Sequence, residues 1–199
     1  MENKIGQLIL IRHGESDWNK ANIFTGQTDV HLTKDGFRAS EKFGLLISDK
    51  HIDKVFTSTL ARSIETEVCM MSGSENCSTE TIFYSDALNE RDYGDFVGKN
   101  KSDEEKRIGK EEVFKLRRAW NYPVPNGETL KMVYERVIPY FLSEILPILK
   151  KGENVLIVSH GNTLRSLVKY IENISDKDIE NVEMIFDEII IYNLLLGRN

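Results

Sequence analysis

Short apolar runs alternate with stretches of helical periodicity along most of this chain. Two four-residue runs, Leu8–Ile11 and Val155–Val158, are typical of buried strands. Shorter runs predict further strands that end at Thr57 and that span 81–84 and 189–196. Apolar residues recur at helical spacing in four other segments, 35–48, 60–71, 128–149 and 163–171. This alternation predicts an α/β protein of three α/β/α layers, with a mainly parallel central sheet and helices on both faces.

The boundaries of these elements carry signals of their own. Thr33 precedes the first predicted helix and is a candidate N-cap, because its hydroxyl can accept from a free N–H of the first turn. Pro139 lies inside the longest predicted helix and predicts a kink or break, since proline removes a helical hydrogen bond. Residues 16–30 and the charged stretch 89–126 fit neither pattern and are long enough for functional loops or an inserted cap. We expect a single domain over 1–199 with a cap-like segment around 89–126.

Composition and charge narrow the class of protein. The chain has 199 residues, of which 40% are hydrophobic and 29% charged, as in an ordinary folded protein. Its net charge of −6 argues against nucleic-acid binding, so an anionic substrate would need a local cluster of cations. No apolar run approaches the ~18–20 residues that span a bilayer, and the N-terminus has no apolar signal region. We therefore expect a cytoplasmic protein with no membrane partner.

The same short pattern follows both buried strands. Arg12-His13-Gly14 comes directly after the first, and Ser159-His160-Gly161 comes directly after the second. The carboxyl ends of parallel strands face one crevice, so two neighbouring strands would bring His13 and His160 together. Arg62 lies near the start of the helix that follows the third strand, at the same edge of the sheet. Two histidines and two arginines are therefore predicted to converge.

These residue types suit phosphoryl transfer. Arginine binds phosphate oxygens in pairs and keeps its charge at physiological pH, and a neutral imidazole is a good nucleophile. The second histidine and both arginines would neutralise a phosphoryl group during transfer. Glu90, in a polar stretch, is the best-placed carboxylate to give a proton to the leaving oxygen. The chain contains no common metal-binding spacing, so we predict that no metal takes part.

Longer motifs around these residues resemble a known family. The string Arg-His-Gly-Glu-Ser-Asp-Trp-Asn at 12–19 is similar to the signature of the cofactor-dependent phosphoglycerate mutases, within the histidine phosphatase superfamily. Further matches follow in the family's order over about residues 8–174: Phe24-Thr25-Gly26, Leu60-Ala61-Arg62, Asn89-Glu90-Arg91-Asp92-Tyr93, Asn100-Lys101, Arg117-Arg118 and Ser159-His160-Gly161-Asn162-Thr163-Leu164-Arg165.

The resemblance implies a role for each matching residue. His13 would be the phosphorylated nucleophile, Glu90 the general acid and base, and Arg12, Arg62 and His160 would stabilise the transferring phosphoryl group. The family interconverts 3-phosphoglycerate and 2-phosphoglycerate, is primed by 2,3-bisphosphoglycerate and needs no metal. Its small anionic substrate would be bound by Arg12, Ser16, Asn19, Thr25, Gly26, Arg62, Glu90, Arg91, Tyr93, Lys101, Arg117, Arg118, Gly161 and Asn162.

The chain departs from the family pattern in three places. The span 119–126 is short where longer members carry an insertion, which implies a short-form member that is a monomer or a weak homo-oligomer. Glu183-Met-Ile-Phe-Asp replaces the usual Pro-Thr-Gly turn before the last strand. The sequence stops at Asn199 without the Lys- and Ala-rich tail that helps close the site in longer members. Without this tail, we expect water to be excluded from the site less completely, which changes the ratio of phosphoryl transfer to hydrolysis.

Three functions remain open from the sequence. They are a glycolytic mutase, a phosphatase on the same scaffold in which water takes the phosphoryl group from His13, and a phospho-ligand sensor without catalysis. The intact Arg-His-Gly motif and Glu90 argue against the sensor. Lys101, Arg117 and Arg118 separate the other two, because a mutase must also hold the carboxylate and far phosphate of a bisphosphorylated intermediate. We therefore predict the mutase.

Overall fold

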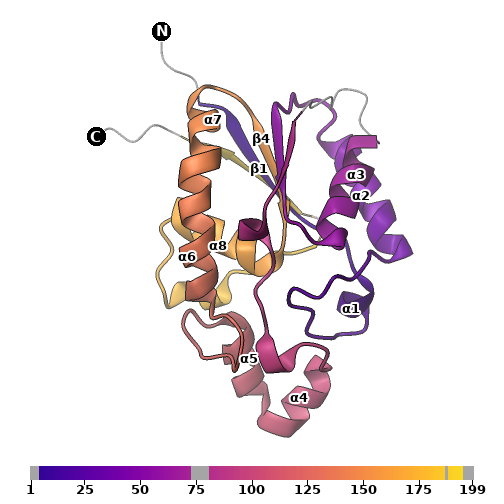
Figure 1. Ribbon diagram of the computed structural model, residues 1–199, viewed down its shortest axis with the longest axis vertical. Coiled ribbons are helices and arrows are strands. Elements are labelled where there is room, and N and C mark those ends of the chain that lie inside the picture. Colours follow the sequence, from indigo (N-terminus) through magenta and orange to yellow (C-terminus); the bar gives the residue numbers. More distant parts are fainter. Residues whose placement is uncertain (1–4, 73–80, 187, 195–199) are drawn as a thin grey trace.

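A five-stranded sheet forms the middle of the computed structural model, which describes residues 5–72, 81–186 and 188–194 (Figure 1). β1 to β4 pair in parallel, whereas β5 joins β1 antiparallel at one edge, so the predicted mainly parallel sheet is confirmed. Residues 195 and 196 of the last predicted strand lie outside the described residues. The order across the sheet is β3-β2-β4-β1-β5, and the strands are β1 (Gln7–Arg12), β2 (Lys54–Thr57), β3 (Ile82–Tyr84), β4 (Val155–Ser159) and β5 (Ile189–Asn193).

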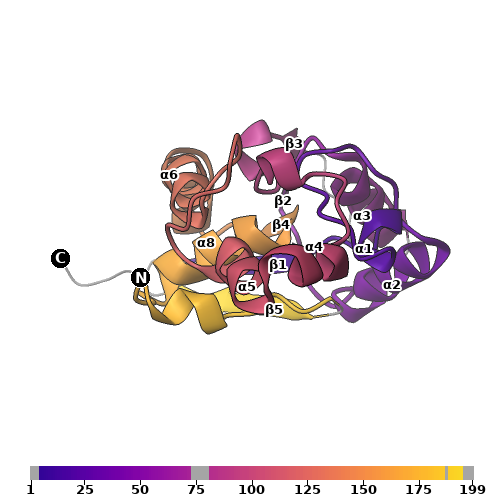
Figure 2. The same cartoon turned by 90° about the horizontal axis from the view of Figure 1, so that it is seen from below.

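Helices bury both faces of this sheet, because successive side chains of a strand point to opposite faces. Leu8 and Leu10 of β1 pack in one apolar cluster with residues of α6 (Leu130–Tyr140) and α8 (Gly161–Ile171). Ile9 and Ile11 pack in a second cluster with residues of α2 (Lys34–Leu46) and α3 (Ala61–Ser72). Figure 2 shows the two groups of helices on either side of the strands. The predicted three-layer arrangement is therefore confirmed.

The helix boundaries follow the predicted signals. Thr33 is the N-cap of α2, and its hydroxyl accepts a hydrogen bond from the Gly36 N–H at 2.9 Å. α6 runs through Pro139, and a π-helical turn, η3 (Phe141–Ile145), follows it and leads into α7 (Leu146–Lys150). The predicted interruption is thus present just after Pro139, which has no N–H to donate to the regular ladder. Across the described residues, no helix has the length and apolar content needed to cross a membrane.

The charged stretch after β3 folds into short helices at the carboxyl edge of the sheet. Figure 1 shows α4 and α5 beyond the end of the strands. Val113 and Leu116 of α5 pack with Phe24, Phe96 and Val124 in a small apolar cluster. This packing buries the side of α5 that carries Val113 and Leu116. The short elements of this region and of the flanking loops are α1 (Asp17–Lys20), η1 (Asp86–Leu88), η2 (Gly94–Phe96), α4 (Lys101–Ile108), α5 (Lys110–Arg118) and η4 (Asp178–Asn181).

Candidate active site

The two histidines that follow β1 and β4 lie side by side at the carboxyl edge of the sheet. β1 and β4 are parallel neighbours, with Arg12 opposite Ser159. The His13 backbone N–H donates to the Ser159 carbonyl at 2.9 Å and continues this pairing past the end of β1. The ring centroids of His13 and His160 are 4.9 Å apart. The convergence predicted from the matching strand ends is therefore confirmed.

His13 is held as a neutral imidazole with one free nitrogen. Its Nδ1 lies 2.7 Å from the Gly14 carbonyl oxygen. That oxygen can only accept, so Nδ1 carries the proton and Nε2 keeps its lone pair. Burial, together with the charges of Arg62 and Arg12, lowers the pKa of His13 well below its ordinary value. The ring is therefore neutral near pH 7, and its unprotonated Nε2 is in the state that attacks phosphorus.

His160 is fully buried beside His13. Within the described part of the chain, its ring has an unpaired N–H, whereas His13 has a free lone pair. Its Nε2 lies 2.7 Å from the Ser58 hydroxyl, which accepts from the Leu60 N–H at 3.3 Å. Burial and the charge of Arg62 lower the pKa of His160 well below its ordinary value, so this ring is also neutral. With the hydroxyl donating to Nε2, the ring proton sits on Nδ1, which has no partner among the described residues. Buried polar groups are normally paired, so this N–H is a candidate contact for a bound anion.

Two arginines, the buried Arg62 and the partly buried Arg12, flank the histidines and keep their charges available. Arg62 donates to the carbonyl oxygens of Gly26 at 2.8 Å and Thr28 at 2.9 Å. Arg12 donates to the Met184 carbonyl at 2.6 Å, and its Nε has no partner among the described residues. Burial lowers the pKa of Arg12 and lowers the pKa of Arg62 to about 10, so both remain cations at neutral pH. These carbonyl partners carry no net charge, so an anion can still be bound.

Glu90 places a carboxylate at the N-terminus of α8. Its Oε1 accepts from the Arg91 N–H at 2.8 Å, from the Asn162 N–H at 3.2 Å and from Asn162 Nδ2 at 3.2 Å. A negative charge at a helix N-terminus is stabilised by the helix dipole and the free N–H groups. Glu90 also lines the pocket that contains His13, so a carboxylate and a neutral imidazole face the same cavity.

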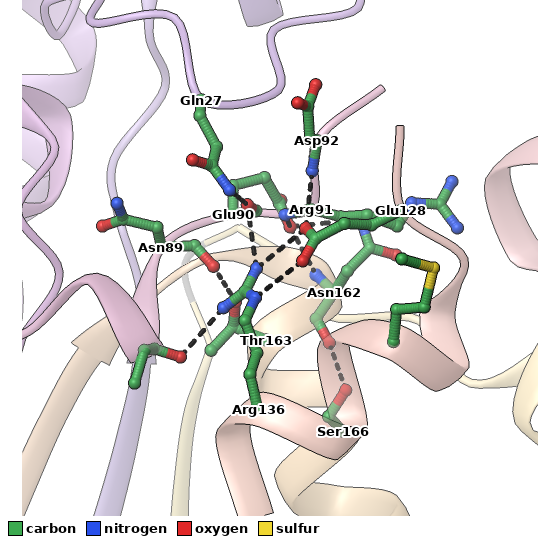
Figure 3. A network of polar contacts seen from close by, with 12 residues as sticks. Gln27, Asn89, Glu90, Arg91, Asp92, Glu128, Arg136, Asn162, Thr163 and Ser166 are labelled. Carbon is green, nitrogen blue, oxygen red and sulfur yellow. Dashed lines mark hydrogen bonds and ion pairs between the residues drawn. The ribbon is translucent and has the colours of Figure 1, made fainter. Parts of the chain in front are cut away.

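The backbone that carries Glu90 is fixed by a second set of contacts, shown in Figure 3. The Glu90 carbonyl accepts from Gln27 Nε2 and from Arg136 Nη2, both at 3.1 Å. Arg136 also pairs with both carboxylate oxygens of Glu128, at 2.9 and 3.1 Å. Two donors from separate segments therefore hold the position of the Glu90 main chain.

The cap contributes a second group of cations to the pocket. Lys101 at the start of α4 and Arg117 and Arg118 at the end of α5 line it with Arg12 and Arg62. Burial and the nearby charge of Arg117 lower the pKa of Lys101 to about 8. Positive charges that gather in one pocket favour an anionic ligand. Among the described residues, no group of three His, Cys, Asp or Glu side chains could hold a metal ion.

Comparison with known proteins identifies the family. The family model of the histidine phosphatase superfamily (branch 1) matches residues 8–196. This chain belongs to the histidine phosphatase superfamily. The family predicted from the motifs is therefore confirmed.

Sequence relatives and a solved structure agree with this assignment to the superfamily. A 2,3-bisphosphoglycerate-dependent phosphoglycerate mutase of Parvibaculum lavamentivorans is 43% identical, over 94% of this chain and 90% of its own length. A protein of the same description from Cytophaga hutchinsonii is 42% identical, over 89% of this chain and 82% of its own length. The solved structure of Bacillus stearothermophilus YhfR superposes with a TM-score of 0.81 at 26% identity and covers 94% of this chain and 90% of its own.

Most residues that the superfamily resemblance assigned to substrate binding line the pocket, and two do not. Ser16 is buried, and its hydroxyl caps α1 by accepting from the Asn19 N–H at 3.3 Å. Arg91 is also buried; it donates to the Leu116 carbonyl, and its guanidinium carbon lies 4.5 Å from the Tyr93 ring centroid. Both side chains support the pocket wall instead of lining it. The other assigned residues that line the pocket are Asn19, Thr25, Gly26, Tyr93, Gly161 and Asn162.

Three residues that line the pocket were absent from the predicted site: Arg165, Glu183 and Met184. Arg165 lies in the Ser-His-Gly-Asn-Thr-Leu-Arg motif, so that motif could have signalled it. It donates to the carbonyl oxygens of Arg118 at 2.8 Å and Ile179 at 2.6 Å, which ties α5 and η4 to α8. Glu183 and Met184 lie where the sequence departs from the superfamily pattern, so the motifs carried no signal for them.

Proposed function

We propose that this protein interconverts 3-phosphoglycerate and 2-phosphoglycerate through a phosphohistidine at His13, primed by 2,3-bisphosphoglycerate. One observation carries the proposal: a neutral histidine with a free Nε2 shares a pocket with two separate groups of cations. The first group, Arg12 and Arg62, lies beside the nucleophile, and the second comes from the cap. The descriptions of the relatives from Parvibaculum lavamentivorans and Cytophaga hutchinsonii support the same reaction.

The residues of the pocket suit 2,3-bisphosphoglycerate. Arg12 Nε in the pocket wall is a buried polar atom without a partner among the described residues, and so is Nδ1 of His160, which does not line the pocket but lies beside His13. A phosphoryl group on His13 would supply acceptors for both. Lys101 and the two cap arginines would hold the carboxylate and the second phosphate, since charge-assisted bonds are the strong ones. When bound, this compound supplies the phosphoryl group that primes His13.

The chain's own residues then carry out two transfers. His13 Nε2 passes its phosphoryl group to the C2 hydroxyl of 3-phosphoglycerate: the N–P bond breaks, an O–P bond forms, and Glu90 accepts the hydroxyl proton. After the bound compound reorients, His13 takes the phosphoryl group from the C3 oxygen, and Glu90 returns the proton to that oxygen. In both steps Arg12, Arg62 and His160 neutralise the charge on the transferring group.

The cap cations favour this reaction over simple hydrolysis. A phosphatase needs to hold one phosphoryl group, for which Arg12, Arg62 and the histidines suffice. A mutase must retain a bisphosphorylated compound while it turns, and that requires cations away from the nucleophile. We further propose that the substrate is a free metabolite of the cytoplasm, and that the protein acts as a monomer or a weak homo-oligomer.

A coupled assay of 3-phosphoglycerate conversion to 2-phosphoglycerate tests the proposal. The rate should depend on added 2,3-bisphosphoglycerate and should be unaffected by EDTA. Phosphate release without isomerisation in the wild-type protein would replace the mutase with the phosphatase. Strict loss of activity on chelation would show that a metal takes part.

A further inference from the structure

Residues 182–186, between η4 and β5, run along the pocket and contact two of its arginines. Arg12 donates to the Met184 carbonyl at 2.6 Å, and the Phe186 ring centroid lies 3.6 Å from the Arg12 guanidinium carbon. Arg118 donates to the Val182 carbonyl at 3.1 Å and forms an ion pair with Glu183. The contacts of the Glu183 and Phe186 side chains depend on the sequence of this segment, which departs here from the family's Pro-Thr-Gly turn.

Glu183 brings a second carboxylate into a pocket whose other charged side chains are mainly cations. Among the described residues that line it, Glu90 and Glu183 carry carboxylates. The Glu90 carboxylate is bonded to the N–H groups of Arg91 and Asn162, at the catalytic end. Glu183 pairs instead with Arg118, one of the cations that the proposed function assigns to the substrate.

The ion pair between Glu183 and Arg118 is asymmetric. The Glu183 side chain is 63% exposed, whereas the Arg118 side chain is 19% exposed. Arg118 is also held by its bond to the Val182 carbonyl, so it stays in the pocket when the pair opens. Ion pairs with an exposed partner are weak, so Glu183 can turn into water. Arg118 then keeps its bond to the uncharged Val182 carbonyl, and its charge is left without an anionic partner. A ligand carboxylate can therefore take its place.

We propose that Glu183 is a specificity-determining residue. Its carboxylate, which belongs to the protein itself, competes with the carboxylate of phosphoglycerate for Arg118. This inference rests on the proposed function, which places the substrate carboxylate among the cap cations. Its consequence is selective. Glu183 weakens the binding of phosphate esters that carry a carboxylate and leaves esters without one almost unaffected.

The same competition affects the bisphosphorylated intermediate. Glu183 loosens its hold at the end away from His13, so the intermediate escapes more often before it reorients. Removing the Glu183 charge should therefore lower the escape rate. The ratio of phosphate release to isomerisation should fall with it.

Calorimetric titration of the whole protein tests this inference. Glu183→Gln keeps the shape of the side chain and removes its charge, and 3-phosphoglycerate and glycerol 3-phosphate serve as probes with and without a carboxylate. Glu180→Gln is the matched control, because it removes the same charge from η4, outside the residues that line the pocket. Loss of the competitor should tighten the binding of 3-phosphoglycerate by about 2- to 5-fold and that of glycerol 3-phosphate by less than about 1.5-fold.

The result that overturns the inference is equal tightening of both probes, or none, in Glu183→Gln. Tightening of 3-phosphoglycerate by the same factor in Glu180→Gln would also overturn it, since the effect would then come from the overall charge. Failure of the proposed function is a separate outcome. It would appear as a wild-type protein that does not isomerise 3-phosphoglycerate, whatever the titrations show.

Discussion

Replacing Arg117 with alanine should remove one of the contacts that separate a mutase from a phosphatase. Arg117 lies at the end of α5, lines the pocket and is half-buried. Its guanidinium makes no hydrogen bond to the described residues, so its donors are free for a ligand. A charge-assisted hydrogen bond to a carboxylate or phosphate contributes about 1.5–3 kcal/mol. At 1.4 kcal/mol per decade, its loss weakens retention of the bisphosphorylated intermediate by roughly 10- to 150-fold.

Lys101, a neighbouring cation, limits this weakening of retention. Burial and the charge of Arg117 hold the pKa of Lys101 at about 8, so the pKa of Lys101 should rise when Arg117 is removed. The gain in positive charge at Lys101 offsets part of the deficit, and we expect an effect toward the lower end of the range. Arg117→Lys should fall between the wild type and Arg117→Ala, because it keeps the charge but loses the planar fork of donors.

Two rates measured on each variant check this prediction. One is isomerisation of 3-phosphoglycerate in a coupled assay, and the other is release of inorganic phosphate. In Arg117→Ala the ratio of release to isomerisation should rise, while hydrolysis of a small phosphomonoester should be largely unchanged. Lys110→Ala is the control, because Lys110 is exposed on the same helix and does not line the pocket. If Arg117→Ala isomerises phosphoglycerate as fast as Lys110→Ala, Arg117 is a surface charge and the reasoning fails.

The remaining predictions concern the catalytic centre and its pH dependence. Labelled 2,3-bisphosphoglycerate should give an acid-labile, alkali-stable phosphoprotein, and His13→Ala should abolish both label and turnover; a label that survives excludes His13. Glu90→Gln should lower kcat by about 10²–10⁴-fold with little change in KM, and a near-normal kcat would mean that another group moves the proton. Because the pKa of Lys101 is about 8, kcat/KM should fall as the pH rises through 8, and Lys101→Arg should remove that fall; an unchanged profile would contradict the role of Lys101.

Local pattern in the sequence was sufficient for the layers of the fold and for the convergence of His13 and His160 at one edge of the sheet. Buried runs at β1 and β4 are each followed closely by His-Gly, which predicted that the two histidines meet if the strands are neighbours. The structure makes these strands neighbours, with Arg12 opposite Ser159. The inference holds because strand periodicity and the common edge of a parallel sheet depend on short-range features. The same reasoning located the interruption of the long helix near Pro139, although the π-helical form of that turn was not readable.

Tertiary packing alone decided which polar side chains reach the pocket. Ser16 and Arg91 belong to the predicted motifs, yet both are buried outside it, one as a helix cap and the other bonded to the Leu116 carbonyl. On α5, Arg117 lines the pocket and Lys110 faces solvent, because Val113 and Leu116 pack on residues distant in sequence and thereby orient the helix.

Glu183 shows the same limit most clearly. The sequence revealed that residues 183–187 depart from the family pattern, but it carried no sign that this carboxylate meets Arg118, 65 positions earlier in the chain. That contact depends on where η4 and the following segment come to lie against α5. Contacts of this kind arise from the packing of distant elements, so they cannot be read from local periodicity or motif spacing.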